Sequence, residues 1–186
     1  MSRYFDIRAT VLIVVGHGIL PEEEDRPTAY ELKRLIVDRT QGAQDRSAVV
    51  LTDIWALNQE MAEFFPTIAV GGPGVNALTA QIYEDLPVAF TRDQELFIQL
   101  DEDGGKRAAV WGMDHAKTRE AVEIFVRDGF LDRFLDLVWG RAGGAPDRNR
   151  RLRRGGVRRP ALGHGARVRP PGLGHGRGRC PRAVAP

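Results

Sequence analysis

Three short apolar runs in the first half of the chain predict three buried strands. Thr10–Val15 reads Thr-Val-Leu-Ile-Val-Val, Ser47–Thr52 reads Ser-Ala-Val-Val-Leu-Thr, and the shorter run Thr67–Val70 ends at a cluster of glycines. An apolar, β-branched run without polar alternation is typical of a strand that is covered on both faces. Each run is therefore expected inside a sheet rather than at its edge.

Helical patterns separate these runs and also follow the last of them. After the first run, apolar positions recur every three or four residues through Asp38, and Asp25 is a plausible cap for that helix. Shorter helices are expected near residues 57–64 and 75–86. Asp114 leads into a helix that ends near Gly129, and a second amphipathic helix follows it.

The remaining strands are expected in an antiparallel arrangement. Residues 95–101 and 107–111 flank a glycine-containing turn and predict a hairpin, and residues 87–90 form a short candidate fourth strand. Strand and helix alternate three times before this hairpin, which favours parallel strands with helices on both faces. The predicted fold class is α/β: a three-layer sandwich with a mainly parallel, Rossmann-like sheet plus an antiparallel hairpin.

Composition changes abruptly at Gly140 and divides the chain into two predicted parts. Residues 141–186 contain 13 Arg, 10 Gly, 6 Pro and 6 Ala with a single acid, so their net charge is +12. Residues 1–140 carry 14 Lys and Arg against 24 Asp and Glu, a net charge of −10. The second part has no aromatic residue and few apolar ones, which predicts a disordered tail after an α/β domain at 1–140.

Two explanations of the tail stay open. A basic Arg/Gly segment can bind nucleic acid through phosphate contacts, but aromatic residues for base stacking are absent. Arg, Gly, Ala and Pro are also the residues that an out-of-frame translation of GC-rich DNA produces. Nucleic acid is therefore not the expected partner, and it would bind only through this tail.

Location and metal binding follow from simple absences in the sequence. The start of the chain has no apolar segment of a signal peptide, and the first apolar run is too short to span a bilayer, so a cytoplasmic protein without membrane contact is expected. Cys180 is the sole cysteine and leaves the domain without disulfides. His164, His175 and Cys180 lack the paired spacing of a metal site, and no metal is predicted.

The candidate site is the edge where the predicted parallel strands end. In an open α/β sheet, ligands bind outside the carboxyl ends of the strands, and four strand-to-helix loops converge there. These loops contribute small, polar and titratable residues. The predicted ligand-binding residues are Gly16, His17, Gly18, Asp53, Gly71, Gly72, Gly74, Asn76, Asp114 and His115.

The glycine cluster after the third run fits a phosphate-binding pattern. Gly72-Pro-Gly-Val-Asn-Ala77 matches G-x-G-x-x-G/A, and Asp93 lies about twenty residues on, where an acid could meet a ribose. Glycines let the backbone approach a phosphate, and a helix N-terminus supplies amide donors. The alternative is a tight turn in which Asn76 only caps the helix.

Other candidate residues also have plain structural interpretations. His17 is either a loop residue with one backbone hydrogen bond or an acid/base group, Asp114 is most simply a helix cap, and His115 is expected to be exposed. The acidic residues 22–25 predict a solvated helix start, with a mobile acidic lid as the alternative. Because the possible metal ligands lie singly on separate loops, these residues predict no metal site.

Several reaction classes are excluded by the residues present. Ser2 and Ser47 are the only serines of the predicted domain, no G-x-S-x-G motif exists, and the domain has no cysteine, so serine and thiol nucleophiles are not expected. A Walker A loop is also absent.

Two segments carry a resemblance to known proteins. Residues 71–76 and 111–121 resemble segments of uncharacterised bacterial α/β proteins that carry a GGPGVN loop, and they are similar to the GGPxxN and TxxA elements of surface-layer protein domains. The second resemblance implies a structural role for the glycines. Neither resemblance implies catalytic residues.

The sequence thus predicts a site without naming a reaction or a cofactor. The leading hypothesis is a soluble α/β domain that binds a small anionic or nucleotide-like ligand at its glycine-rich strand-end loops. The alternative is a non-enzymatic structural or protein-interaction module in which the glycines serve only as turns.

Overall fold

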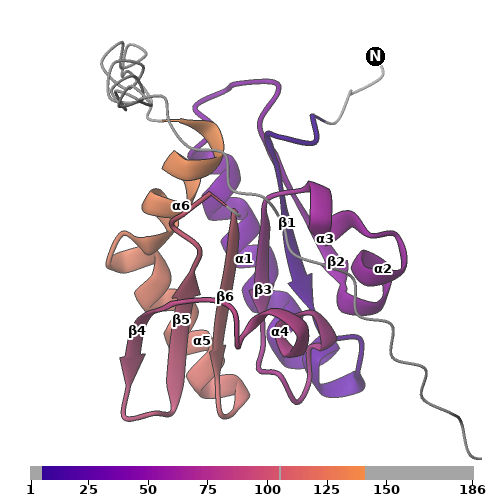
Figure 1. The fold of residues 1–186 in the computed structure, drawn as a ribbon, viewed down its shortest axis with the longest axis vertical. Helices are drawn as coiled ribbons and strands as arrows, with labels where there is room; N and C mark the ends of the chain where they lie inside the picture. The colour runs from indigo at the N-terminus through magenta and orange to yellow at the C-terminus, as the bar shows by residue number, and fades with distance from the viewer. Residues whose placement is uncertain (1–5, 105, 141–186) are drawn as a thin grey trace, which may run out of the picture. The chain divides into compact units, whose positions relative to one another are not determined.

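The three apolar runs lie side by side in the computed structural model, with the first between the other two (Figure 1). The parallel strands are β1 (Thr10–Val15), β2 (Ser47–Thr52), β3 (Thr67–Val70) and β6 (Arg107–Gly112). Two antiparallel strands complete the sheet, β5 (Leu96–Leu100) beside β6 and β4 (Val88–Arg92) at the edge. The strand order is β2-β1-β3-β6-β5-β4. The structure describes residues 6–104 and 106–140.

Helices cover both faces of this sheet. The first face packs against α1 (Arg26–Asp38), α5 (His115–Arg127) and α6 (Phe130–Trp139), and a π-helical turn, η1 (Pro21–Asp25), leads into α1. The other face packs against α2 (Asp53–Asn58), α3 (Met61–Phe64) and α4 (Ala77–Ile82). Successive residues of a strand point to opposite faces, so every residue of β1 is buried in one core or the other.

The predicted fold class is confirmed. The sheet is mainly parallel, it lies between two helical layers, and β5 with β6 forms the expected antiparallel hairpin. The described residues all belong to one compact unit. The expected disordered tail at 141–186, with His164, His175 and Cys180, lies outside the described residues.

Three local predictions were wrong in detail. The helix expected at 57–64 is two helices, because Glu60 adopts a left-handed conformation with φ of 52° between them. The helix expected at 75–86 ends at Ile82, and the Gln99 side chain then donates to the carbonyls of Tyr83 and Leu86. Asp25 does not cap α1 through its side chain, which is buried instead.

The connections bring two loops together at the carboxyl ends of β1 and β3. From β1 the chain passes through α1 to β2 on one side, and it then crosses back over β1 through α2 and α3 to reach β3. The helices of these two connections lie on opposite faces, so the sheet has its topological switch point between β1 and β3. Loops from both strands flank this point.

The central position of β1 gives a direct stability test. Ile13 is fully buried, so Ile13→Ala should lower the free energy of unfolding by about 2–5 kcal/mol through lost burial and a residual cavity. The matched change Ile19→Ala removes the same atoms from a side chain that is 79% exposed, and it should cost less than about 0.5 kcal/mol. Urea denaturation measures both values. Equal losses would contradict the buried central strand.

Candidate functional site

One buried amide joins three elements at the switch point. Asn76 has no exposed surface, and its Nδ2 donates to the carbonyl oxygens of Val14 in β1 and Val70 in β3, each at 2.9 Å. Its Oδ1 accepts from the amides of Leu78 and Thr79 at 3.0 and 3.3 Å, which caps α4. The expected capping role is therefore confirmed, and the same side chain also holds the ends of two strands together.

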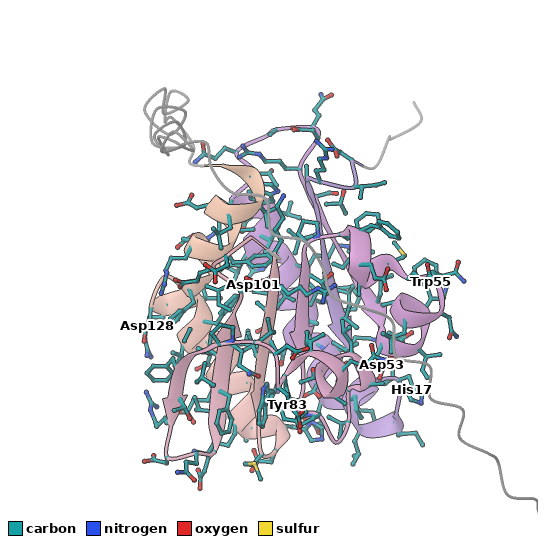
Figure 2. All side chains as sticks on the ribbon, in the orientation of Figure 1. His17, Asp53, Trp55, Tyr83, Asp101 and Asp128 are labelled. Atoms are coloured by element: carbon teal, nitrogen blue, oxygen red, sulfur yellow. The ribbon has the colours of Figure 1, made fainter. Side chains whose placement is uncertain are left out.

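A second buried side chain, Asp53, connects the loops after β1 and β2 with α4. Its Oδ1 lies 3.0 Å from Nδ1 of His17 and accepts from the amide of Ile54 at 2.7 Å. Its Oδ2 accepts from the amide of Ala77 at 2.7 Å. Figure 2 shows His17 and Asp53 next to each other. The sequence left two interpretations of His17 open, and in the structure Nδ1 of its ring pairs with this carboxyl group rather than with the backbone.

These contacts use the donors that a phosphate would need at α4. The Asp53 side chain takes the amide of Ala77, and Asn76 takes the amides of the next two residues. A carboxyl group of the protein thus stands where a helix N-terminus would hold an anionic ligand. Asp93 lies in the turn after β4, and β6 and β5 stand between β4 and β3, a separation of roughly 14 Å at ordinary strand spacing.

The glycines of the four loops have different packing roles. A Cβ on Gly16 would overlap the carbonyl oxygen of Val75, and a Cβ on Gly112 would overlap the backbone at Lys117. Gly16 and Gly112 are thus needed for close approach of chain segments. A Cβ on Gly74 would have no atom within 4 Å, and Gly74 has no such requirement.

A second carboxyl–imidazole pair lies on the first face of the sheet. Asp25, at the end of η1, has an Oδ1 that lies 3.0 Å from Nδ1 of His115, the first residue of α5. The Asp25 side chain is 2% exposed and the His115 side chain 29%. His115 was expected to be exposed, and this was wrong because η1 brings Asp25 against it.

Asp25 is in an unusual electrostatic position. Its Oδ2 is buried and has no hydrogen-bond partner among the described residues, and it lies 2.9 Å from where a Cβ on Gly71 would stand. Burial raises the pKa of Asp25 above its ordinary value of 3.8, and Glu24 adds to this, while His115 acts in the opposite direction. Such an acid is costly to ionise and is a common feature of functional sites.

A pocket of about 270 Å³ opens between the turns that follow β3 and β6. Asp25 and His115 are part of its wall. The other lining residues are Gly72, Pro73, Gly74, Val75, Trp111, Gly112, Met113, Asp114 and Thr118. Trp111 is fixed there by stacking on Phe97 at 4.3 Å between ring centroids and by a 3.0 Å bond from its Nε1 to Gln99.

A larger hollow of about 370 Å³ lies elsewhere, between α2, α3 and α4. Glu60, Glu63, Asp85, Asp101 and Arg107 supply its charged groups, and none of the predicted ligand-binding residues lines it. The predicted strand-end residues point to the smaller pocket.

Eight of the ten predicted residues fall into two groups. Gly16, His17, Asp53 and Asn76 lie around the switch point, where hydrogen bonds and close packing hold the loops together. Gly72, Gly74, Asp114 and His115 line the pocket. Gly18 and Gly71 belong to neither group. Gly71 lies beside Asp25 and has a φ of 101°. Asp114 caps α5 by accepting from the amide of Lys117 at 2.7 Å, as expected.

Asp25 and the apolar pocket residues Trp111 and Met113 were not among the site residues predicted from the sequence. Asp25 was interpreted as a cap because it precedes a helical pattern, and Trp111 and Met113 were interpreted as strand and turn residues. Asp25 ends an acidic run, and only the structure shows that it is the buried member of that run.

No protein-family model matches this sequence, and no curated protein matches it. Within residues 6–104 and 106–140, no group of three or more His, Cys, Asp and Glu side chains is placed to hold a metal ion. No described helix is both long and apolar enough to cross a membrane.

The two kinds of glycine can be separated by the same substitution. Gly16→Ala should destabilise the protein by about 1–3 kcal/mol or more, because the new methyl group overlaps the Val75 carbonyl. Gly74→Ala should be neutral or stabilise by up to about 1 kcal/mol, because it only restricts the unfolded chain. Thermal and urea unfolding of both variants measure the difference. Tolerance of Gly16→Ala would show that the two loops do not touch in solution.

The raised pKa of Asp25 predicts a pH-dependent effect on stability. The native state holds this proton to a higher pH than the unfolded chain does, so the contribution of Asp25 to stability falls as pH rises from 3.8 through the native pKa. Asp25→Asn removes this loss. The difference in unfolding free energy, variant minus wild type, should therefore increase across that range in urea titrations at several pH values. A difference that decreases with pH would contradict a raised pKa.

Proposed function

We propose that this chain is a small-ligand-binding α/β domain whose ligand occupies the pocket between the β3–α4 turn and the β6–α5 turn. The observation that carries the proposal is the buried Asp25 carboxyl group in the wall of this pocket, with one oxygen that has no partner among the described residues. Buried polar atoms are nearly always hydrogen-bonded, and an exception in a residue of a pocket wall supports a functional role for that residue.

The wall supports a particular class of ligand. Trp111, Met113 and Val75 offer apolar surface, while Asp25 and Asp114 offer carboxyl groups. Two cations that adjoin wall residues in the sequence are paired with acids: Arg26 with Glu22, and Lys117 with Glu95 and Glu120 at 3.2 and 3.3 Å. A neutral or cationic molecule with an apolar body and hydrogen-bond donors fits these groups best.

The size of the pocket restricts the ligand further. A volume of about 270 Å³ is slightly below the range of about 300–1,000 Å³ that is usual for drug-sized ligands, so the ligand is smaller than a dinucleotide. The anionic or nucleotide-like ligand that the glycine pattern predicts would place negative charge near Asp25 and Asp114. It therefore stands as the competing ligand class.

The second candidate function is a structural or protein-interaction module. It is supported by the bonds of Asn76 and by the packing of Gly16 and Gly112, which give these residues complete structural roles without a ligand. The resemblance to surface-layer elements implies the same role for the glycines and stays a prediction.

A thermal-shift screen distinguishes the candidates. The compounds are small amines, amides and amino alcohols with apolar groups, and the comparison arm contains nucleotides, dinucleotides and inorganic phosphate. A ligand at a hundred times its dissociation constant should stabilise the native state by about 2.7 kcal/mol. We expect shifts in the first arm. Shifts in the second arm alone would favour the anionic class, and none in either arm would favour the structural module.

Variants test whether a compound that binds uses this pocket. Asp25→Asn should weaken its binding at least about tenfold, equivalent to about 1.4 kcal/mol, because the carboxyl group becomes an amide that also donates. Asp45→Asn, at an exposed aspartate, is the matched control and should leave binding unchanged. Equal binding by both variants would place the ligand outside this pocket.

A further inference from the structure

We propose that Asp25 and His115 form a proton-transfer pair, in which His115 Nε2 takes a proton from, or gives one to, the molecule in the pocket. This inference rests on the proposed function for the position of the ligand and adds a reaction type to it. It makes His115 a catalytic residue and Asp25 the residue that positions its ring.

The geometry of the imidazole ring leaves one nitrogen for the ligand. Nδ1 lies 3.0 Å from the buried Asp25 Oδ1, and Nε2 is on the opposite side of the ring, away from that carboxyl group. The partial exposure of His115 and its place in the pocket wall give the ring access to a bound molecule. A buried carboxyl group that holds an imidazole by Nδ1 fixes the tautomer in which Nε2 is a base.

The protons of the pair can be counted without knowing how the inner one is shared. When the extra proton lies on the Oδ1–Nδ1 contact or on the ring, the pair is either a neutral acid beside a neutral imidazole or a carboxylate beside an imidazolium, and Nε2 carries hydrogen in both. With that proton removed, the carboxylate accepts from Nδ1–H and Nε2 has a free lone pair. Proton exchange with the ligand therefore takes place at Nε2.

The charged surroundings of the pair come from three elements. Glu24 on η1 raises the pKa of Asp25, and Asp114 precedes His115. The neighbouring cations are paired with acids, Arg26 with Glu22 and Lys117 with Glu95 and Glu120. From β3, Gly71 contributes only backbone beside Oδ2. The pair is therefore the one acid/base unit of the described pocket wall that joins a buried carboxyl group to an imidazole.

The pocket wall also restricts the reaction. No serine or cysteine is among the described lining residues, and the hydroxyl oxygen of Thr118 accepts from the amide of Gly112 at 3.1 Å. This favours proton transfer without a covalent intermediate. The substrate is a neutral or cationic molecule with hydrogen-bond donors, the class proposed above. One of its O–H or N–H bonds breaks, an N–H bond forms at Nε2, the electron pair stays on the substrate oxygen or nitrogen, and the proton returns to another substrate atom.

The His17–Asp53 pair is a control within the same molecule. It has the same 3.0 Å contact through Nδ1, but both Asp53 oxygens also accept backbone amides. His17 has a side chain that is 58% exposed and does not line the pocket.

Reaction of the full chain with diethyl pyrocarbonate tests the proposal without a ligand. The neutral Nε2 attacks a carbonyl carbon of the reagent and displaces ethyl carbonate, which takes the Nδ1 proton and decomposes to ethanol and carbon dioxide. Peptide mass spectrometry gives the rate at each histidine between pH 5 and 8. We expect Asp25→Asn to slow the reaction at His115 at least about fivefold and to change its pH profile, with His17 unaffected. Asp53→Asn should leave His115 unaffected. Unchanged rate and pH profile at His115 in Asp25→Asn would overturn the proposal.

Nitrogen-15 NMR of the wild-type imidazoles provides a test that needs no variant. At pH 8, His115 should carry its proton on Nδ1 and have a bare Nε2, and a proton on Nε2 would overturn the proposal. Failure of the proposed function has a different signature. If a compound binds but His115 carries its proton on Nε2, the pocket binds a ligand and the proton-transfer proposal fails. If His115 has the expected tautomer but no compound binds, the pair is supported and the proposed ligand class is rejected.

Discussion

The carboxyl-terminal edge of this sheet depends on the hydrogen bonds of one buried amide, that of Asn76. Its four hydrogen bonds hold the carboxyl ends of β1 and β3 together and cap the start of α4. Leaving a buried donor or acceptor unpaired costs about 1–3 kcal/mol, so loss of this side chain would affect two strand ends and a helix together. The position of the glycine turn that leads into α4 follows from this anchor.

The edge contains two carboxyl–imidazole pairs, which differ in whether both carboxyl oxygens have hydrogen-bond partners. Asp53 has bonds to both oxygens and ties three segments together, which is how a structural carboxyl group is expected to be held. Asp25 is as deeply buried, yet one of its oxygens has no partner in the described part of the chain. Natural folds keep such local violations mainly at functional sites, because the surrounding structure must offset their cost. This contrast, rather than the glycine pattern, directs attention to the pocket beside His115.

The glycine pattern shows why a motif needs its surroundings. Gly72-Pro-Gly-Val-Asn-Ala77 has the spacing of a phosphate-binding turn, and a strand and a helix do flank it. The amides that such a turn would offer at α4 are already bonded by Asp53 and Asn76. Asp53 lies twenty-four positions before Ala77 in the sequence, so no local pattern could reveal that its carboxyl group occupies this place. Gly16 is a similar case. It must lack a side chain because the carbonyl oxygen of Val75, which is distant in the sequence, packs against it.

The sequence by itself determined the layers of this protein. A strand that is covered on both faces appears as an uninterrupted apolar run, and a helix that is buried on one face has apolar residues every three or four positions. It also determined the caps Asn76 and Asp114, whose hydrogen bonds span only two or three residues. Only the tertiary structure decided the pairing of Asp25 with His115, ninety positions apart, and with it the character of the pocket. Local rules describe what a residue does for its own helix or strand. Whether a carboxyl group is solvated, bonded or left buried with a free oxygen depends on which distant segments pack around it.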